Sequence, residues 1–346
     1  MADVGFATHL NFAQICRCLL YLVYFIYLGS SSTVVTFPSV DEVVKTDAFP
    51  TAIWQLEPHR EGMLPVAAGR GGPLNIHWEV HGDGPIKLIL IQGLGVLKSS
   101  WQRQTVHFGH VNGDQYSVLL LDNRGMGRSD RPMMRYSTSA MAADILEVLD
   151  HLSWTDERQL HVCGISNSTV AYTARNLFPI EWLTEPDDVI LPDETVPRCR
   201  MPIGGWPYRR FESNYARFIA QEITKKRDHE GFTRSGFLLQ VIACGWHYKS
   251  AAQLRGLGDK IGRQRILVIH GTEDKIISVP HGRKLIEYLQ PGKSLVVDGM
   301  GRKFLALESP GQKAKVTLTL PARIPSLELP HSLKEKLLIR VLQMPR

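Results

Sequence analysis

Short apolar runs, each followed by a turn that carries polar side chains, recur along this chain and limit its fold more than any other feature. The runs occupy residues 86–93 (IKLILIQG), 117–122 (SVLLLD), 159–164 (QLHVCG), 265–271 (RILVIHG) and 293–299 (KSLVVDG). Runs of this length without polar alternation are typical of strands buried on both faces. Segments of helical length lie between several of them. The alternation predicts an α/β fold with a mostly parallel sheet.

The flanking segments are less regular. Residues 74–82 (LNIHWEVHG) alternate apolar and polar side chains, which predicts a half-buried strand. We therefore expect a main domain over residues 73–301, preceded by a linker or arm at 31–72 that is rich in Ser, Thr, Pro and Gly. Within the domain, residues of about 180–258 read as a helical cap inserted between strands.

Net charge separates the C-terminal segment from the rest of the chain. The formal charge is +6, and residues 302–346 alone hold nine Lys or Arg against three Glu. The body of the chain is thus neutral, and the tail is basic and atypical for this fold. A neutral body without a basic groove argues against a nucleic-acid partner. The five cysteines show neither a disulfide framework nor zinc-ligand spacing.

The N-terminal residues 1–30 contain one long apolar stretch. Residues 19–28 (LLYLVYFIYL) form the apolar part of a segment spanning 15–28. Ten residues are short for a membrane span and fit the core of a signal peptide. The alternatives are a cleaved signal, an uncleaved segment that associates with a membrane, and either a helix packed on the domain or a wrongly assigned start site. Secretory or membrane location follows from the first two, and cytoplasmic location from the third.

The turns after the strands hold the candidate chemistry, because ligands bind at the carboxyl ends of parallel strands. The turn after residues 159–164 begins Gly164-Ile165-Ser166-Asn167-Ser168. This pattern is similar to the nucleophile elbow G-x-S-x-G, with serine in place of the last glycine. A serine that caps a helix would give a similar pattern. This turn takes its place in the chain among the polar turns that follow the other four strands. That order favours the interpretation of Ser166 as a nucleophile over that of a helix cap.

Two longer stretches resemble the α/β-hydrolase superfamily. They are DNRGMGRSD at residues 122–130, with the following YS and MAADILEVLDHL, and RILVIHGTEDKIISVPHG at 265–282. The resemblance covers residues 74–301. Within the superfamily, the chain is similar to uncharacterised fungal hydrolases of this fold. It implies an α/β-hydrolase fold with a mostly parallel sheet and a helical cap, and a serine hydrolase that acts on an ester or related acyl bond.

The resemblance also implies the roles of individual residues. Ser166 would be the nucleophile and Asp274 the carboxylate that orients a histidine; the less favoured alternative for Asp274 is a loop carboxylate. The backbone N–H groups of Leu94 and Asn167 would form the oxyanion hole. Such a site needs no cofactor and no metal. Its partner would be a small-molecule acyl substrate or an apolar ligand.

The chain departs from the family pattern at Arg302. The family has Gly-x-Gly-His after the last strand, and this chain reads Gly299-Met300-Gly301-Arg302. Arginine stays protonated and cannot serve as a general base. Four other histidines are available but less suitable: His247, His270, His281 and His331.

A second departure lies between Ser166 and Arg265. The fold requires a full helix after the elbow and then another buried strand, yet cap-like sequence follows almost at once. We therefore expect one core strand to be missing, which would leave a gap or open edges in the sheet.

Three functions remain open from the sequence. The first is a serine hydrolase whose catalysis is impaired by Arg302. The second is a non-catalytic protein of the same fold that binds a small molecule or another partner. The third is a misassembled chain that does not fold stably.

Overall fold

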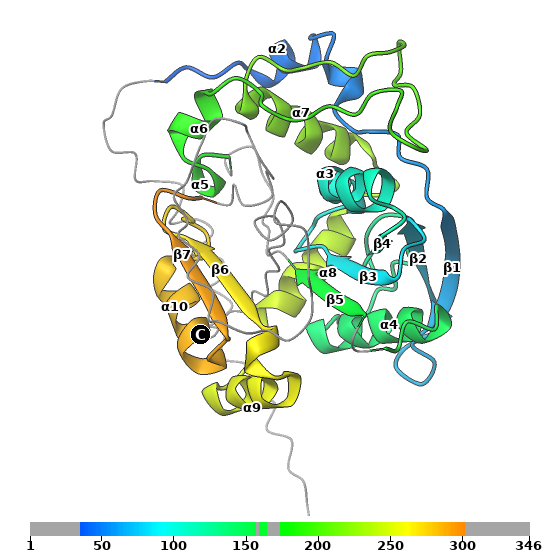
Figure 1. The fold of residues 1–346 in the computed structure, drawn as a ribbon, viewed down its shortest axis with the longest axis vertical. Coiled ribbons are helices and arrows are strands. Elements are labelled where there is room, and N and C mark those ends of the chain that lie inside the picture. Colours follow the sequence, from blue (N-terminus) through cyan, green and yellow to red (C-terminus); the bar gives the residue numbers. More distant parts are fainter. Residues whose placement is uncertain (1–34, 157–158, 165–173, 302–346) are drawn as a thin grey trace, which may run out of the picture. The chain divides into compact units, whose positions relative to one another are not determined.

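The computed structural model describes residues 35–156, 159–164 and 174–301. The chain divides into two compact units, Met1–Phe37 and Pro38–Arg346. Every helix and strand discussed below belongs to the second unit, and the labels are those of Figure 1.

A five-stranded mixed sheet forms one part of this unit, in the order β1-β2-β4-β3-β5. Strands β3, β4 and β5 run parallel to one another, whereas β1 and β2 join antiparallel at one edge. Figure 1 shows the same order across the sheet. The strands are β1 (Arg60–Val66), β2 (Leu74–His81), β3 (Ile86–Ile91), β4 (Tyr116–Leu121) and β5 (Leu160–Gly164).

Both faces of the central strands are buried, which explains their continuous apolar sequence. Ile89 of β3 and Leu119 of β4 pack on one face with the helix α4 (Thr138–His151). Leu90 of β3 and Leu120 of β4 pack on the other face with Trp101 and Phe108. Trp101 belongs to the helical segment η2 (Lys98–Trp101) and Phe108 to η3 (Thr105–Val111), and the short helix α3 (Gln102–Gln104) joins these two segments. The predicted parallel core is confirmed.

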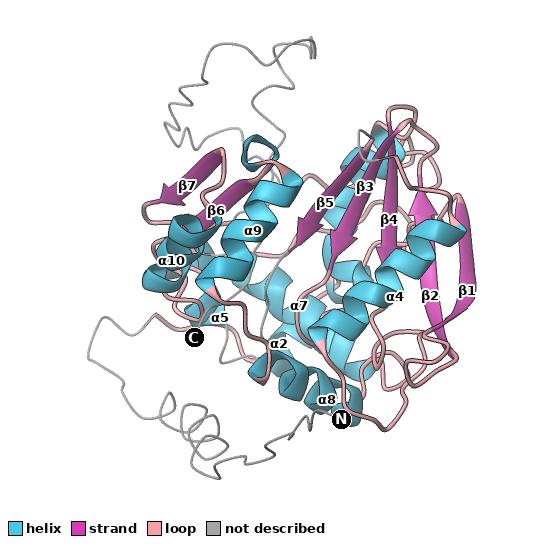
Figure 2. Cartoon of the chain, turned by 90° about the horizontal axis from the view of Figure 1, so that it is seen from below, coloured by secondary structure: helices cyan, strands magenta, loops and turns pink. Residues whose placement is uncertain are grey.

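The sequence of helix α4 accounts for both its start and its buried face. It has 14 residues, and the Ser137 side chain caps its first turn by accepting a hydrogen bond from the Ala140 N–H. Ile145, Val148 and Leu149 are buried at helical spacing against the sheet. Figure 2 shows α4 lying across the strands of the five-stranded sheet.

Two further strands form a separate sheet. Strand β6 (Leu267–Gly271) pairs in parallel with β7 (Lys293–Val297), and the helices α9 (Ala251–Ile261) and α10 (Val279–Leu289) pack against them. Within residues 35–156, 159–164 and 174–301, no strand joins β5 to β6. This division agrees with the missing core strand expected from the sequence.

The predicted cap contains the helices α6 (Ile180–Thr184), α7 (Asn214–Arg227) and α8 (Arg234–Gly245), and it follows the short helix α5 (Ala174–Leu177). One buried ion pair stabilises its interior, because the Arg217 side chain donates to Asp187 Oδ2 at 2.5 Å. Both side chains are almost completely buried.

The segment predicted as a linker, residues 31–72, holds regular structure. Strand β1 lies in it, as do the helix α2 (Val40–Val44) and the short helical turn η1 (Phe49–Thr51). Val43 and Ala52 pack with Ile219 of α7. Strand β1 was not predicted because it is a mostly exposed edge strand, and Gly62 and Pro65 are residues that strands disfavour.

The N-terminal apolar stretch lies outside the described residues. In the part of the chain that the structure describes, no helix is long and apolar enough to cross a membrane.

Candidate active site

The turn after β3 carries the first predicted site residue, Leu94. It is half-buried, and the next residue, Gly95, is buried with a φ of 64°, a left-handed conformation that favours glycine. The Gly95 N–H donates to Gln240 Oε1 at 3.0 Å. The Leu94 amide therefore belongs to a turn with a fixed backbone at the carboxyl end of a central strand.

The turn after β4 is held together by its own polar groups. Asp122 Oδ2 accepts from the Arg128 N–H at 3.1 Å, and the Ser129 hydroxyl donates to the Asp122 carbonyl at 2.6 Å. A Cβ on Gly127 would lie 2.0 Å from the Asp122 carboxylate, so only glycine fits there. Asp130 Oδ2 accepts from the Asn75 N–H at 2.7 Å. Asp122 therefore stabilises the turn, and Asp130 joins its end to β2.

The predicted nucleophile lies just beyond strand β5. The strand ends at Gly164, and Ser166 and Asn167 lie outside the described residues. The parallel pairing of β5 with β3 brings Gly164 opposite Ile91. The chain therefore enters the predicted elbow at the same sheet edge at which the Leu94 turn begins.

Asp274 lies in the turn after β6 and is almost completely buried. Its Oδ1 atom accepts backbone N–H groups from Ile276 at 3.0 Å and Ile277 at 2.9 Å. Two N–H donors on one oxygen fix the carboxylate in the turn. This geometry suits a carboxylate that orients another group, as the family resemblance implies.

The turn after β7 lies against the turn that holds Asp274. The Glu273 N–H donates to the Met300 carbonyl at 3.0 Å, and a Cβ on Gly271 would lie 2.6 Å from the Gly301 carbonyl. The main chain thus reaches Gly301 beside the Asp274 turn. Arg302, the next residue, lies outside the described part.

Three of the alternative histidines can be placed, and His331 lies outside the described residues. His270 is fully buried, and its ring lies against Gly282 of α10, where a Cβ would come within 2.6 Å. The Nδ1 atom of His281 lies 3.0 Å from the Ser278 hydroxyl, and that of His247 lies 2.6 Å from the Thr138 hydroxyl. His281 and His247 thus each contact a hydroxyl group, and His270 packs in the core.

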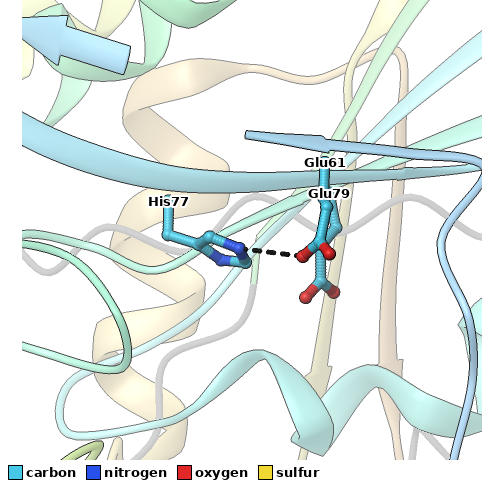
Figure 3. A group of neighbouring side chains, drawn as sticks. All are labelled: Glu61, His77 and Glu79. Atoms are coloured by element: carbon cyan, nitrogen blue, oxygen red, sulfur yellow. Dashed lines mark hydrogen bonds and ion pairs between the residues drawn. The ribbon is translucent and has the colours of Figure 1, made fainter. Parts of the chain in front are cut away.

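A group of ionisable side chains lies on one face of β2 and β1 and borders the turn after β4. Figure 3 shows Glu61, His77 and Glu79 close together, with His77 Nε2 3.2 Å from Glu61 Oε2. Their ligand atoms all lie within 4.8 Å of one another, a spacing that could hold a metal ion.

One cationic side chain, that of Lys98, already lies within this group, however. Lys98 Nζ lies 2.7 Å from Asp122 Oδ2, 3.2 Å from Glu79 Oε1 and 2.9 Å from His77 Nδ1. Burial alone would raise the pKa of Glu79, but the hydrogen bond from His81 and the charge of Lys98 outweigh it and lower that pKa. Because the lysine supplies the positive charge, the group is an internal ion cluster.

Sequence reasoning did not identify Gln240 or Lys98 as neighbours of the site. Gln240 lies far along the chain in the predicted cap, and Lys98 is the first residue of η2, so neither belongs to a recognisable motif. The only sequence signal for Gln240 was its place as a polar residue within an otherwise apolar run, LLQVIA.

Comparison with known proteins agrees with this arrangement. Residues 87–166 match the family model described as alpha/beta hydrolase fold. The curated 3-oxoadipate enol-lactonase 2 of Acinetobacter baylyi is 37% identical over 79 residues, which are 23% of this chain and 27% of that protein. A 2-hydroxy-6-oxononadienedioate/2-hydroxy-6-oxononatrienedioate hydrolase of Escherichia coli K12 is 32% identical over 109 residues, 30% of this chain and 37% of that protein.

The likeness to solved structures is more distant. Est816, described as an N-acyl homoserine lactone degrading enzyme, covers 68% of this chain and 93% of its own at 16% identity and a TM-score of 0.44. So low a score carries no argument about the reaction.

The chain spans only about a third of the length of the curated relatives named above. Both relatives are bacterial, so a particular likeness to fungal hydrolases finds no support among them. The matched residues run from β3 through the turn after β5, and they contain the Leu94 turn, the Asp122–Asp130 turn and Ser166. Over residues 87–166, about a quarter of the chain, the sequence matches the alpha/beta hydrolase fold family.

Proposed function

We propose that this chain is a serine-type hydrolase that acts on an ester or lactone bond. Ser166 is the nucleophile, Asp274 is the orienting carboxylate, and the N–H groups of Leu94 and Asn167 stabilise the oxyanion. The observation that carries the proposal is the buried Asp274 carboxylate, fixed by two backbone N–H groups in the turn after β6. That turn contacts the chain at Gly301, directly before the position where the family has histidine.

The substrate class rests on the relatives. The curated relative of Acinetobacter baylyi is an enol-lactonase, and a lactone is a cyclic ester. A serine nucleophile attacks the acyl carbon of either bond, and the alkoxide is released as the leaving group. Two N–H donors at the developing oxyanion contribute roughly 3–4 kcal/mol each in such sites.

We further propose that turnover by this chain is slow because Arg302 stands at the histidine position. Without a base to take its proton, a serine hydroxyl is a poor nucleophile. Removal of one member of a catalytic triad leaves roughly 10³–10⁴-fold catalysis over water in well-studied enzymes. Residual hydrolysis is therefore expected rather than none.

A second candidate function follows from the arginine at the histidine position. With Arg302 at this position and two separate sheets among the described residues, the chain could retain the fold as a binding protein for a small apolar molecule. In that case Ser166 would have no role in turnover.

The test compares hydrolysis of p-nitrophenyl butyrate and a γ-lactone by the full chain and three variants. Because the chain as it stands lacks the base, the serine variants are made in the Arg302→His chain. There Ser166→Ala should abolish the gained activity, and the neighbouring Ser168→Ala should keep it within about threefold, as a matched control. Arg302→His should raise the rate by about 100-fold or more, since a histidine restores a general base. Equal rates for Arg302→His with and without Ser166→Ala would refute the hydrolase and favour the binding protein.

A further inference from the structure

Helix α8 presents two different faces. Gly236, Gln240 and Ala243 recur at helical spacing and are buried, whereas Leu238 and Ile242 on the other face are exposed. A glutamine in the centre of a buried helix face needs partners for both its carbonyl oxygen and its amide nitrogen.

The buried face of α8 lies directly against the turn after β4. A Cβ on Gly236 would lie 1.9 Å from the Gly125 carbonyl oxygen, so the helix backbone touches the turn without side chains between them. Just before the helix, the Gly231 carbonyl accepts from the Gly127 N–H at 2.7 Å. These contacts fix the position of α8 on the core.

Gln240 follows one turn after Gly236 and uses both ends of its carboxamide. Its Oε1 atom accepts from the Gly95 N–H at 3.0 Å, and its Nε2 donates to the Arg124 carbonyl at 3.1 Å. The side chain is 3% exposed. Gly95 and Arg124 belong to the turns after β3 and β4, which are neighbouring parallel strands. One cap side chain therefore joins two turns at the predicted catalytic edge of the sheet.

We propose that Gln240 is a positioning residue for the oxyanion hole, an inference that rests on the proposed hydrolase function. Its hydrogen bond fixes the peptide between Leu94 and Gly95. The adjacent peptide carries the Leu94 N–H, the proposed oxyanion donor. Because Gly95 has a left-handed backbone and no side chain, little else at this residue restrains the turn. Oxyanion donors act only when held at the place where charge develops.

The position of the cap and the geometry of the site are coupled by this bond. A displacement of α8 would remove the acceptor from the Gly95 N–H and release the turn. The Leu94 N–H is thus held in place only while α8 is docked on the turn after β4.

The experiment uses the full chain and three variants. Gln240→Met keeps the approximate volume and removes both hydrogen bonds. Gln240→Glu keeps an acceptor for the Gly95 N–H and, when protonated in this buried place, a donor for the Arg124 carbonyl. Leu238→Met on the exposed face of the same helix is the control. Two quantities are measured well below the melting temperature: amide hydrogen exchange of Gly95, and the rate of Ser166 labelling by a fluorophosphonate.

We expect Gln240→Met to speed Gly95 exchange at least tenfold, without a change at Leu119 in the centre of the sheet. The maximal labelling rate should fall at least tenfold, while the probe concentration for half-maximal rate changes less than threefold. Gln240→Glu should restore both quantities to within about threefold of the unmodified chain. Unchanged Gly95 exchange in Gln240→Met, or faster exchange with unchanged labelling, would overturn the positioning role.

The experiment distinguishes failure of the proposed hydrolase function from failure of the positioning role alone. If the unmodified chain shows protected Gly95 exchange but no labelling of Ser166, the hydrolase assignment falls, and the positioning role falls with it. If the unmodified chain is labelled and Gln240→Met behaves like it, only the positioning role is lost.

Discussion

Arg124 and Asp144 form a two-point ion pair in the interior of the sheet domain. Arg124 Nε donates to Asp144 Oδ2 at 2.8 Å, and its Nη2 donates to Oδ1 at 2.7 Å. Both side chains are almost completely buried. The pair fastens the turn after β4 to helix α4, and the carbonyl of the same arginine accepts from Gln240.

Loss of one partner of this pair should destabilise the fold strongly. Asp144→Asn leaves the Arg124 charge buried without its counter-ion, and removal of one partner of a buried pair costs about 3–5 kcal/mol of unfolding free energy. Urea unfolding measures the change. Asp259→Asn removes an exposed carboxylate of α9 that pairs with Arg263, just beyond the helix, and it should cost less than about 0.5 kcal/mol. Equal effects for the two variants would contradict the role assigned to Arg124 and Asp144.

Acid should destabilise the protein through His110. Its Nδ1 donates to the Pro197 carbonyl and its Nε2 lies 3.0 Å from His81 Nδ1, an arrangement that requires a neutral ring at Nε2. Burial lowers the pKa of His110 from 6.5 to about 4, against the effect of the Pro197 hydrogen bond. Between these pH values the unfolded chain binds a proton that the folded protein does not.

The stability linked to His110 is therefore present above pH 6.5 and is lost as the pH falls toward 4. The shift corresponds to about 3 kcal/mol across this window. Unfolding free energies measured by urea at several pH values should show a shallower acid decline in His110→Gln. The exposed His229→Gln serves as a control with an unchanged decline. An equally steep decline in His110→Gln would count against this account.

Zinc should not stabilise the folded protein through Glu61, His77 and Glu79. Lys98 already contacts His77 and Glu79, and Arg128 contacts Glu61 at 2.9 Å, so a divalent ion would have to displace both cations. The melting temperature should stay within about 1 °C on addition of micromolar Zn²⁺ or of EDTA. A saturable rise that disappears in Glu79→Gln would show that the cluster binds metal.

A methyl group at Gly236 should disrupt the docking of α8. The added Cβ would meet the Gly125 carbonyl at 1.9 Å, a backbone contact that no side-chain rearrangement can relieve. We expect Gly236→Ala to lower the unfolding free energy by about 2–3 kcal/mol, as in overpacked cores. Gly245→Ala at the end of the same helix meets nothing within 4 Å and should be nearly neutral. Thermal unfolding compares the two, and a stable Gly236→Ala would contradict the docked position of α8.

The sequence was sufficient to predict the strands β3 to β7 and helix α4, because buried strands and amphipathic helices leave direct patterns in sequence. It was also sufficient to predict the turns that hold Asp122 and Asp274. It did not predict β1, an exposed edge strand, or the contact between Gln240 and Gly95, which joins residues 145 positions apart. Hydrogen bonds between distant segments depend on tertiary packing, and no local pattern encodes them.

The most direct test of the proposed function is the identification of the residue that a fluorophosphonate modifies. The full chain is incubated with excess probe, digested and examined by mass spectrometry, with Ser166→Ala and Ser168→Ala in parallel. We predict slow formation of one adduct on Ser166, its absence in Ser166→Ala and its persistence in Ser168→Ala. A folded chain that forms no adduct on Ser166, even with Arg302→His, would contradict the assignment of this chain as a serine hydrolase.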